Sequence, residues 1–320
     1  MFDESRGSGL EAMGLQKETV GLVGGNGFVG SAILDCLLHR GITPRVLCGP
    51  LERPRPLPDG ICSTECDLTD AGGLASWSSG LRVVIHAAGP PSVKRSFEMA
   101  DEYVRVHVGG TTALLRACRM AEVGRLVYIS SAEVYGRPER NPVPENHRLQ
   151  ARSPYAAAKI GAEKMIEAHV QSFGLDAIVL RPFSIYGPHF HPDSLLSRIV
   201  STAKEGCIRV RDLRPVRDYC FLGDLATAVF EACCLKGDKL RAINIGSGTG
   251  TSVADFAKLA VLALGLDVPI VADRVDRPGE SEIFELVADI TAAHEILGWH
   301  PETDLATGLR LTVSSDPGSR

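Results

Sequence analysis

Short runs of apolar residues alternate with longer amphipathic stretches through most of the chain. An unbroken apolar run is typical of a strand buried on both faces of a sheet, whereas apolar residues three and four positions apart indicate a helix. The expected strands cover residues 19–24, 44–48, 60–68, 82–89, 125–131, 176–183 and 242–247. The clearest helices cover residues 28–41, 102–121 and 154–174, although Gly109 and Gly110 weaken the second.

This alternation predicts an α/β fold with a doubly wound parallel sheet of the Rossmann type. Residues 1–18 are polar and lack the apolar core of a signal peptide, so we expect a mobile leader. Residues 19–183 plus 216–249 are expected to form the Rossmann domain. The pattern becomes irregular in residues 184–215 and 250–320, which we expect to form a smaller C-terminal region over the carboxyl ends of the strands, where such sheets bind ligands.

Three glycines, Gly24, Gly27 and Gly30, come after the first expected strand and open the first helix. A tight turn, a close approach of the backbone to a pyrophosphate and close helix–strand packing all require residues without a Cβ atom. The N–H groups around Phe28 and Val29 at the helix start suit a phosphate. The motif, between a strand and a helix, predicts a dinucleotide site.

The end of the second strand departs from that pattern. An acidic residue is expected there to bind the adenosine ribose, but the chain has Cys48. Arg53 and Arg55 come next and can either hold a 2′-phosphate or be ordinary loop charges. This motif alone therefore leaves NAD and NADP both open.

A second group of residues predicts chemistry next to the dinucleotide. Tyr155 and Lys159 are four residues apart, which places them on one face of a helix. A free tyrosine is too weakly acidic to serve as a base at neutral pH, and a nearby ammonium together with an oxidised nicotinamide lowers its pKa. Ser131, at the end of the fifth strand, can hydrogen-bond the same substrate hydroxyl.

With these motifs in order, the chain resembles the extended short-chain dehydrogenase/reductase family, in its nucleotide-sugar epimerase and dehydratase branch. The resemblance extends from about residue 19 to residue 310. The segments that carry it are GGNGFVGS, CDLTD, VIHAAG, SSAEVYG, SPYAAAK, LRPFSIYGP, VRDYCFLGDLA, NIGSGTGTSV and RPGE with the later AD and LGWHP.

The resemblance implies a role for further residues. It implies that Asp67 and Leu68 contact the adenine, that Ala87 and Ala88 line the cofactor groove, and that Pro182 packs near the nicotinamide. Ser131, Tyr155 and Lys159 become the catalytic residues. Arg217 and Arg277 match arginines that grip the sugar-nucleotide diphosphate, a task suited to a forked cation. The resemblance also implies that Ser184 lies beside the substrate phosphate.

The same resemblance brings two departures and implies an assembly. His107 and Ser184 stand where the family commonly has asparagine, which leaves the fine positioning of the substrate open. The family implies a homodimer formed by the helices at 102–121 and 154–174.

Glu133 separates the reactions of this branch. All of them begin with oxidation at C4 of the sugar; an epimerase then needs no further base, whereas a dehydratase needs a base to remove H5. Strand geometry predicts that Ser131 and Glu133 point to the same side. Dehydratases and UDP-xylose-forming decarboxylases of the family keep such a Glu, and Ala132 replaces the acid that commonly assists loss of water.

These features predict a redox-neutral nucleotide-sugar dehydratase that recycles NAD in place. Hydride return to C4 would leave a double bond between C5 and C6 of the sugar. The product would then resemble that of the exo-glycal-forming UDP-N-acetylglucosamine 5,6-dehydratases, which belong to the biosynthesis of antibiotics such as tunicamycin. A UDP-sugar 4-epimerase, in which Glu133 is structural, remains open. So does an NADPH-dependent 4-ketoreductase, which the missing strand-two acid favours.

Charge and cysteine usage exclude other classes. The net charge is −5 and there is no basic tract, which argues against nucleic-acid and anionic-membrane partners. No apolar run approaches the roughly 18 residues that a membrane-spanning helix needs. The nine cysteines lack a zinc spacing, so we expect reduced thiols in a cytoplasmic protein and no metal.

Overall fold

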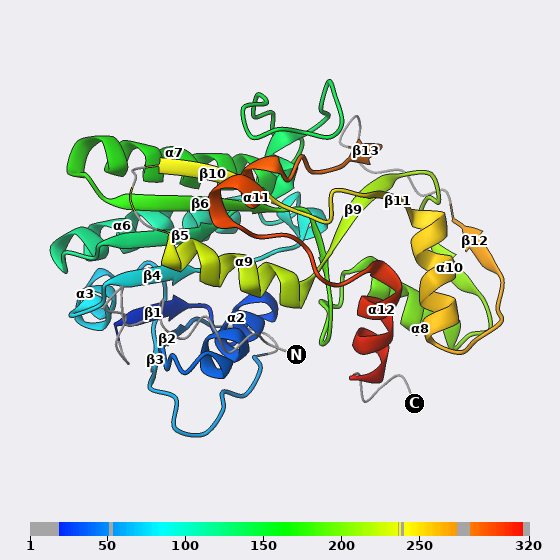
Figure 1. The fold of residues 1–320 in the computed structure, drawn as a ribbon, viewed down its shortest axis with the longest axis horizontal. Helices are drawn as coiled ribbons and strands as arrows, with labels where there is room; N and C mark the ends of the chain where they lie inside the picture. The colour runs from blue at the N-terminus through cyan, green and yellow to red at the C-terminus, as the bar shows by residue number, and fades with distance from the viewer. Residues whose placement is uncertain (1–18, 51–53, 236, 238–239, 274–281, 316–320) are drawn as a thin grey trace.

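The computed structural model describes residues 19–50, 54–235, 237, 240–273 and 282–315, so the expected leader over 1–18 lies outside the described residues. The seven expected strands form one parallel sheet in the order β10-β6-β5-β4-β1-β2-β3 (Figure 1). Their bounds are β1 Val20–Val23, β2 Arg45–Cys48, β3 Ser63–Glu65, β4 Val83–His86, β5 Arg125–Ile129, β6 Asp176–Pro182 and β10 Leu240–Ile245. The order reverses between β1 and β4, which confirms the doubly wound Rossmann sheet and places its ligand crevice there.

Helices cover both faces of the sheet. Helices α2 (Phe28–His39) and α9 (Leu222–Cys234) pack on one face, and α3 (Ala71–Ser78), α6 (Thr111–Met120) and α7 (Pro154–Phe173) pack on the other. Successive strand residues point to opposite faces, so Leu22 belongs to the first core and Val23 to the second. The strands are therefore buried on both sides, which explains their unbroken apolar runs.

The expected helix over residues 102–121 is interrupted. Helix α5 (Ala100–Tyr103) leads into the π-helix η2 (Val104–Gly110), and α6 begins only at Thr111. Gly110 lies against Leu68, because a Cβ atom there would come within 2.6 Å of the Leu68 Cδ2 atom. The wider π turn carries His107, and π turns of this kind occur frequently at functional sites.

The C-terminal region contains small sheets that the sequence did not predict. Strand β9 (Val216–Phe221), expected within the Rossmann domain, instead pairs with β7 (Ser184–Tyr186), β11 (Gly250–Ser252) and β13 (Glu285–Leu286). Strands β8 (Ile208–Val210) and β12 (Ile270–Ala272) form a second pair. Helices α8 (Leu195–Ala203), α10 (Val253–Ala263) and α12 (Leu305–Ser314) complete this region around a third core.

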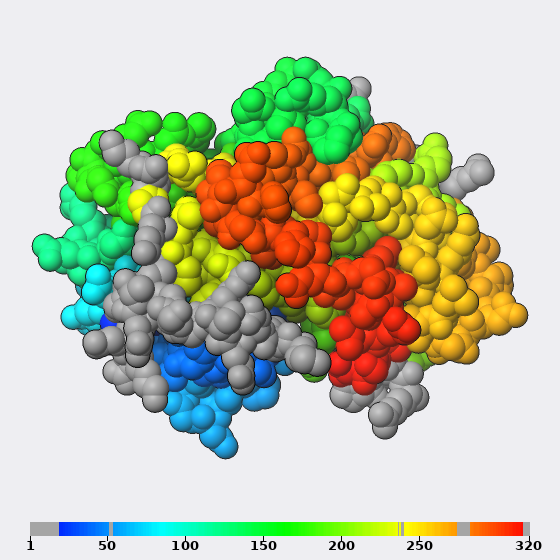
Figure 2. Space-filling model, in the orientation of Figure 1, coloured from blue at the N-terminus to red at the C-terminus, as the bar shows by residue number. Residues whose placement is uncertain are grey.

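The last described segment joins the two halves. Helix α11 (Thr291–Leu297) belongs to the core of the Rossmann sheet through Ala293 and Leu297, whereas α12 packs with α10 through Leu309. Figure 2 shows this orange-to-red stretch running across the junction between the halves. Part of the region that we expected to bind substrate therefore packs with the Rossmann domain.

Neither a membrane span nor a metal centre is found among the described residues. None of their helices is long and apolar enough to cross a membrane. None of their histidine, cysteine and acidic side chains gather in threes or more in a way that could hold a metal ion.

Candidate active site

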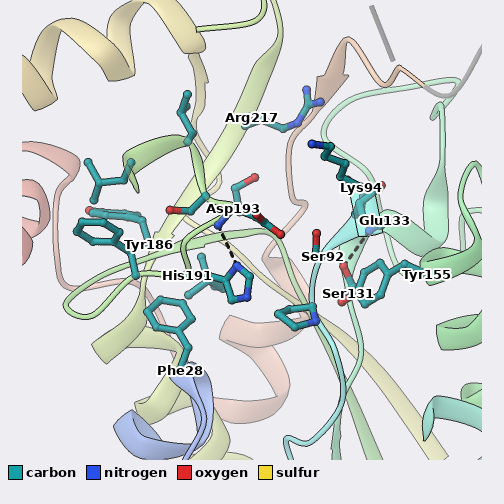
Figure 3. A pocket seen from close by; sticks show the side chains of 18 of the residues that line it. Phe28, Ser92, Lys94, Ser131, Glu133, Tyr155, Tyr186, His191, Asp193 and Arg217 are labelled. Atoms are coloured by element: carbon teal, nitrogen blue, oxygen red, sulfur yellow. Dashed lines mark hydrogen bonds between the residues drawn. The ribbon is translucent and has the colours of Figure 1, made fainter. Parts of the chain in front are cut away.

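A cavity of about 1000 Å³ opens at the carboxyl ends of the central strands and extends under the C-terminal region. Its walls come from the Rossmann domain on one side and from the segment around β7 and α8 on the other. Figure 3 shows Ser131, Glu133 and Tyr155 together on one wall, facing Phe28, Tyr186 and His191 across the space. The volume suits a small-molecule ligand rather than a macromolecule.

The glycine loop has the geometry that its spacing predicts. Gly24 has a φ of +84°, and a Cβ atom there would lie 2.9 Å from the Ala88 Cα atom. A Cβ atom on Gly30 would overlap the carbonyl oxygen of Gly24. Helix α2 starts after Gly27, and no side chain caps its amino end. The loop thus leaves helix N–H groups open beside a backbone cradle that any side chain would fill, and this fits the pyrophosphate of a dinucleotide.

Five of the predicted cofactor contacts line the same cavity. They are Phe28, Val29, Ala87, Ala88 and Pro182. Tyr155 and Lys159 line it as well, so the structure brings together the expected nicotinamide end of the site.

Asp67 and Leu68 are not among the lining residues of this cavity. Leu68 is buried against Gly110. Asp67 accepts hydrogen bonds from the backbone N–H and hydroxyl of Thr69, and it forms an ion pair with Arg105 at 3.2 Å. The Thr69 bonds, helped by Arg105, hold the pKa of the Asp67 carboxyl below its usual range. No sequence pattern indicated this pairing, and the predicted adenine contact of both residues stays a prediction.

Helix α7 carries Tyr155 and Lys159, the pair predicted to be catalytic. Its amino end is capped by Ser153, whose hydroxyl accepts a hydrogen bond from the Ala156 N–H, and Pro154 comes next. Tyr155 and Lys159 are both buried in the next two turns. The Lys159 ammonium donates to the Ile129 carbonyl at 2.7 Å and lies 6.0 Å from the centre of the Tyr155 ring.

Burial dominates the electrostatics of Tyr155 and Lys159 in the protein alone. Burial raises the pKa of Tyr155, and Glu133 and Tyr103 add to the rise, whereas a hydrogen bond with Ser131 opposes it. Burial also lowers the pKa of Lys159 to about 7, although Glu163 opposes that change. The predicted lowering of the tyrosine pKa includes the charge of a bound nicotinamide and stays a prediction; in the protein alone, desolvation raises this pKa.

Glu133 reaches the cavity by a route other than the predicted one. Strand β5 ends at Ile129, and Ala132–Tyr135 forms the 3-10 helix η3, so strand alternation cannot align Ser131 with Glu133. Instead the Ser131 hydroxyl caps η3 by accepting the Glu133 N–H at 3.2 Å. Both side chains line the cavity, and Glu133 is half-buried and close enough to act on the pKa of Tyr155. Ala132 points into a core with Val134 instead.

His107 lies directly beside Tyr155. Its ring is buried and meets the Tyr155 ring edge-on at 5.6 Å between centres. Its Nε2–H donates a hydrogen bond to the Pro90 carbonyl at 3.1 Å. Burial, and secondarily Lys159, hold its pKa well below the usual value, so the imidazole is neutral. The sequence marked this residue only as a departure from a motif.

The cavity contains some of the residues that were predicted to bind the substrate. Arg217 on β9 and Ser184 on β7 line the cavity. The Arg217 guanidinium forms an ion pair with Glu282 at 3.3 Å and donates to the Val216 carbonyl at 3.0 Å. Arg277 lies outside the described residues. Lys94, on the short helix α4 (Val93–Ser96), also lines the cavity, and no sequence pattern indicated it.

Residues 20–246 match the sequence model of the NAD dependent epimerase/dehydratase family. The chain belongs to this family. The dTDP-glucose 4,6-dehydratase of Streptomyces griseus is 32% identical over 307 residues, which cover 92% of each chain. The UDP-glucose 4-epimerase of Mycolicibacterium smegmatis is 30% identical over 91% of this chain and 96% of its own.

Solved structures of the NAD dependent epimerase/dehydratase family agree with the fold. UDP-glucose 4-epimerase from Thermotoga maritima superposes with a TM-score of 0.84 at 27% identity, over 92% of this chain and 97% of its own. TunA, an NAD dependent NDP-hexosamine 5,6-dehydratase involved in tunicamycin biosynthesis, gives 0.83 at 28% identity, over 93% and 97%. The protein is thus an enzyme of the NAD-dependent nucleotide-sugar dehydratase/epimerase family, in which both reactions occur.

Proposed function

We propose that this enzyme is a redox-neutral dehydratase of a nucleotide sugar of the UDP-N-acetylglucosamine type, which it converts into a 5,6-unsaturated sugar. The placement of Glu133 carries the proposal. Its carboxylate shares the cavity with Ser131 and Tyr155, and within the described part of the chain no hydrogen bond or ion pair engages it. A half-buried carboxylate next to the hydroxyl-oxidising residues is suited to remove a proton from the neighbouring carbon.

The cofactor site fits NAD. The cradle of Gly24 and Gly30 and the open amino end of α2 suit the pyrophosphate, and Ala87, Ala88 and Pro182 form the groove toward Tyr155. When bound there, NAD supplies the hydride acceptor for oxidation at C4 and the hydride donor for the final reduction. We assign a cofactor contact to Lys159, whose ammonium donates to the Ile129 carbonyl and which lines the same cavity.

Tyr155 and Ser131 open the reaction. The Tyr155 oxygen takes the proton of the C4 hydroxyl, and the Ser131 hydroxyl, hydrogen-bonded to it, orients the same substrate oxygen. The raised pKa of Tyr155 means that the phenol must be ionised by added positive charge. A protonated Lys159 and the charged nicotinamide together supply that charge.

Glu133 performs the elimination. Oxidation at C4 acidifies H5, which Glu133 removes, and the C6 hydroxyl leaves with that proton as water. Position 132 carries an alanine, 3% exposed within a hydrophobic cluster, so it provides no second acid for the loss of water. Returning hydride to C4 and the Tyr155 proton to its oxygen leaves a product that differs from the substrate by one water.

Arg217 and Ser184 support the same substrate. A guanidinium at the cavity wall suits a diphosphate, and we assign the same role to Arg277. We further propose a cytoplasmic homodimer formed through α6 and α7. All nine cysteines are free thiols, which supports the cytoplasmic location. The exposed side chains Met120 and Phe173 lie at the ends of these two helices, which supports the dimer contact.

A UDP-sugar 4-epimerase is the second candidate, and the buried Ala132 favours it. Loss of water is commonly assisted by a separate acid, which this position lacks, whereas inversion at C4 needs no residue beyond Ser131, Tyr155 and Lys159. In that case the Glu133 carboxylate does no chemistry.

The two candidates are separated by incubating the purified enzyme in heavy water with UDP-N-acetylglucosamine, UDP-glucose and dTDP-glucose, with mass detection of the products. A dehydratase yields a product lighter by one water, and Glu133→Gln abolishes it. Glu139→Gln is the matched control, because Glu139 is exposed, pairs with Arg148 and is not among the cavity-lining residues.

Other outcomes contradict the dehydratase. Inversion at C4 with unchanged mass, no deuterium at C5 and no effect of Glu133→Gln identifies the epimerase. Stoichiometric consumption of NADPH identifies a ketoreductase.

A further inference from the structure

The proposed elimination needs a proton donor for the C6 oxygen of the sugar, and Ala132 does not provide one. Hydroxide is a poor leaving group, so water is lost faster when an acid protonates the oxygen as its bond to carbon breaks. The donor must lie in the cavity near Glu133, because C6 is bonded to the carbon from which Glu133 removes a proton. Two lysines are among the described residues that line the cavity, Lys94 and Lys159.

Of these two lysines, Lys94 has its ammonium available. Lys159 is buried and donates to the Ile129 carbonyl at 2.7 Å. Lys94 is exposed, and within the described part of the chain no hydrogen bond or ion pair holds its ammonium. Other polar side chains of the cavity, such as those of Tyr186 and His191, lie on the wall opposite Glu133 (Figure 3).

The backbone around Lys94 is fixed relative to Tyr155. The hydroxyl of Ser92 caps helix α4, and the carbonyl of Ser92 accepts a hydrogen bond from the Tyr103 hydroxyl at 2.6 Å. Val93, the residue before Lys94, packs against the hydrophobic cluster that contains Tyr103 and Tyr155. The side chain of Lys94 therefore starts from a place that is set by contacts with the expected site of oxidation.

Glu133 is held beside the same tyrosine by a different segment. Its N–H donates to the Ser131 hydroxyl at 3.2 Å, and its carboxylate contributes, after burial, to the raised pKa of Tyr155. Figure 3 shows the side chains of Lys94 and Glu133 next to each other on one wall, with the Lys94 ammonium directed into the cavity. The two side chains form no hydrogen bond or ion pair with each other, so both charges are available to a ligand.

We propose that Lys94 is the acid of the elimination and protonates the C6 oxygen as it leaves, from the same side of the sugar as Glu133. This role rests on the proposed dehydratase reaction. Once C4 is oxidised, Glu133 takes H5 and the electron pair of the C5–H bond forms an enolate. The C5–C6 double bond then forms as the C6–O bond breaks, and Lys94 gives a proton to the oxygen, which departs as water. The proton held by Glu133 afterwards restores the Lys94 ammonium.

This division of roles makes the removal of H5 and the loss of water separable steps. Without Lys94 the enolate still forms, but it returns to substrate by taking a proton at C5 more often than it expels the C6 oxygen. In heavy water, this return places deuterium at C5 of the recovered substrate. A residue that only binds the substrate or only supports the fold would slow both steps together.

Lys94→Met is tested in heavy water with UDP-N-acetylglucosamine, UDP-glucose and dTDP-glucose, by mass detection of product and by NMR of C5 in recovered substrate. We expect this variant to lose water at least about one hundredfold more slowly than the wild-type enzyme, as removal of a general acid implies. It should still place deuterium at C5 and bind UDP with unchanged affinity, whereas Glu133→Gln does not exchange H5. Lys258→Met, at an exposed lysine that pairs with Asp255 and is not among the cavity-lining residues, should behave as the wild-type enzyme does.

Added cations separate proton donation by Lys94 from a purely electrostatic effect. Methylammonium should restore part of the water loss to a Lys94→Ala variant, whereas tetramethylammonium, which has no proton to give, should not. Equal rescue by both cations overturns the proposal, as does water loss from Lys94→Met at the wild-type rate or a loss of UDP affinity that matches the loss of rate. These results leave the dehydratase itself uncontradicted, whereas a wild-type enzyme that releases no water overturns the proposed function and this inference together.

Discussion

Glu163 and Arg181 form a buried, two-point ion pair that contacts Ser130, the residue before Ser131. The Arg181 Nη2 atom lies 2.7 Å from Glu163 Oε2, and Nε lies 3.1 Å from Oε1. The same Glu163 Oε1 atom accepts the Ser130 hydroxyl at 2.5 Å, next to Ser131 in the chain. The pair thereby links β6 and α7 to the end of β5, next to Ser131.

Arg181→Met is expected to lower the free energy of unfolding by about 3–5 kcal/mol, because it leaves the Glu163 carboxylate buried without its cation. Urea denaturation monitored by circular dichroism measures the change. Lys164→Met, which breaks the exposed pair with Glu167, should cost less than about 1 kcal/mol. A loss from Arg181→Met as small as that of this control would show that the buried pair is not a structural anchor.

Lys159 should make the stability of the cofactor-free enzyme depend on pH. Its pKa of about 7 in the folded protein is lower than its value in the unfolded chain, so the unfolded state binds more protons between about pH 7 and pH 10. The free energy of unfolding therefore rises with pH across this window, relative to a Lys159→Met variant. Parallel denaturation curves of the two proteins at pH 7, 8 and 9 check the sign, and a constant difference would contradict it.

Gly30→Ala should weaken cofactor binding for a steric reason. The added methyl group overlaps the Gly24 carbonyl oxygen, so the turn and the start of α2 must move apart. We expect the affinity for NAD to fall at least about tenfold in titration calorimetry, consistent with roughly 1–3 kcal/mol of strain. Gly109→Ala is the control: the nearest atom to its new methyl group is 4.0 Å away, and NAD binding should persist.

Arg217→Ala should weaken the binding of nucleoside diphosphates. Removing a charge-assisted contact to phosphate is expected to cost about tenfold to one hundredfold in the affinity for UDP, measured by calorimetry. Arg214→Ala, three residues earlier, removes a mostly exposed arginine that pairs with Asp212 and should leave UDP binding unchanged. Equal effects of the two substitutions would assign the result to general charge rather than to a built contact.

The sheet was predictable because its signal is local. Buried parallel strands such as β1 and β4 appear as unbroken apolar runs, and the glycine loop marks the turn from β1 into α2. The spacing of Tyr155 and Lys159 likewise carries its geometry within one helix. All seven strands and the face of α7 that carries Tyr155 and Lys159 are encoded by neighbours in the sequence.

The rest depends on contacts between distant residues. Arg105 and Asp67 are 38 positions apart, and Glu163 and Arg181 are 18 apart, so no local pattern reveals either pair. The 3-10 helix after Ser131 and the π turn at His107 arise from capping and packing that override the propensities of a strand and a helix. The raised pKa of Tyr155 in the protein alone depends on how deeply the residue is buried, which no local pattern reveals.

The direction of Ala132 constrains any attempt to redesign this enzyme. Because its methyl group points into the cluster of Val134 and Tyr135, a carboxylate placed at this position would enter the core instead of the cavity. Installing a second acid therefore requires rebuilding the 3-10 turn, not exchanging a single side chain. A single substitution at this position would therefore not by itself give the enzyme a second catalytic acid, because the backbone of the turn would also have to change.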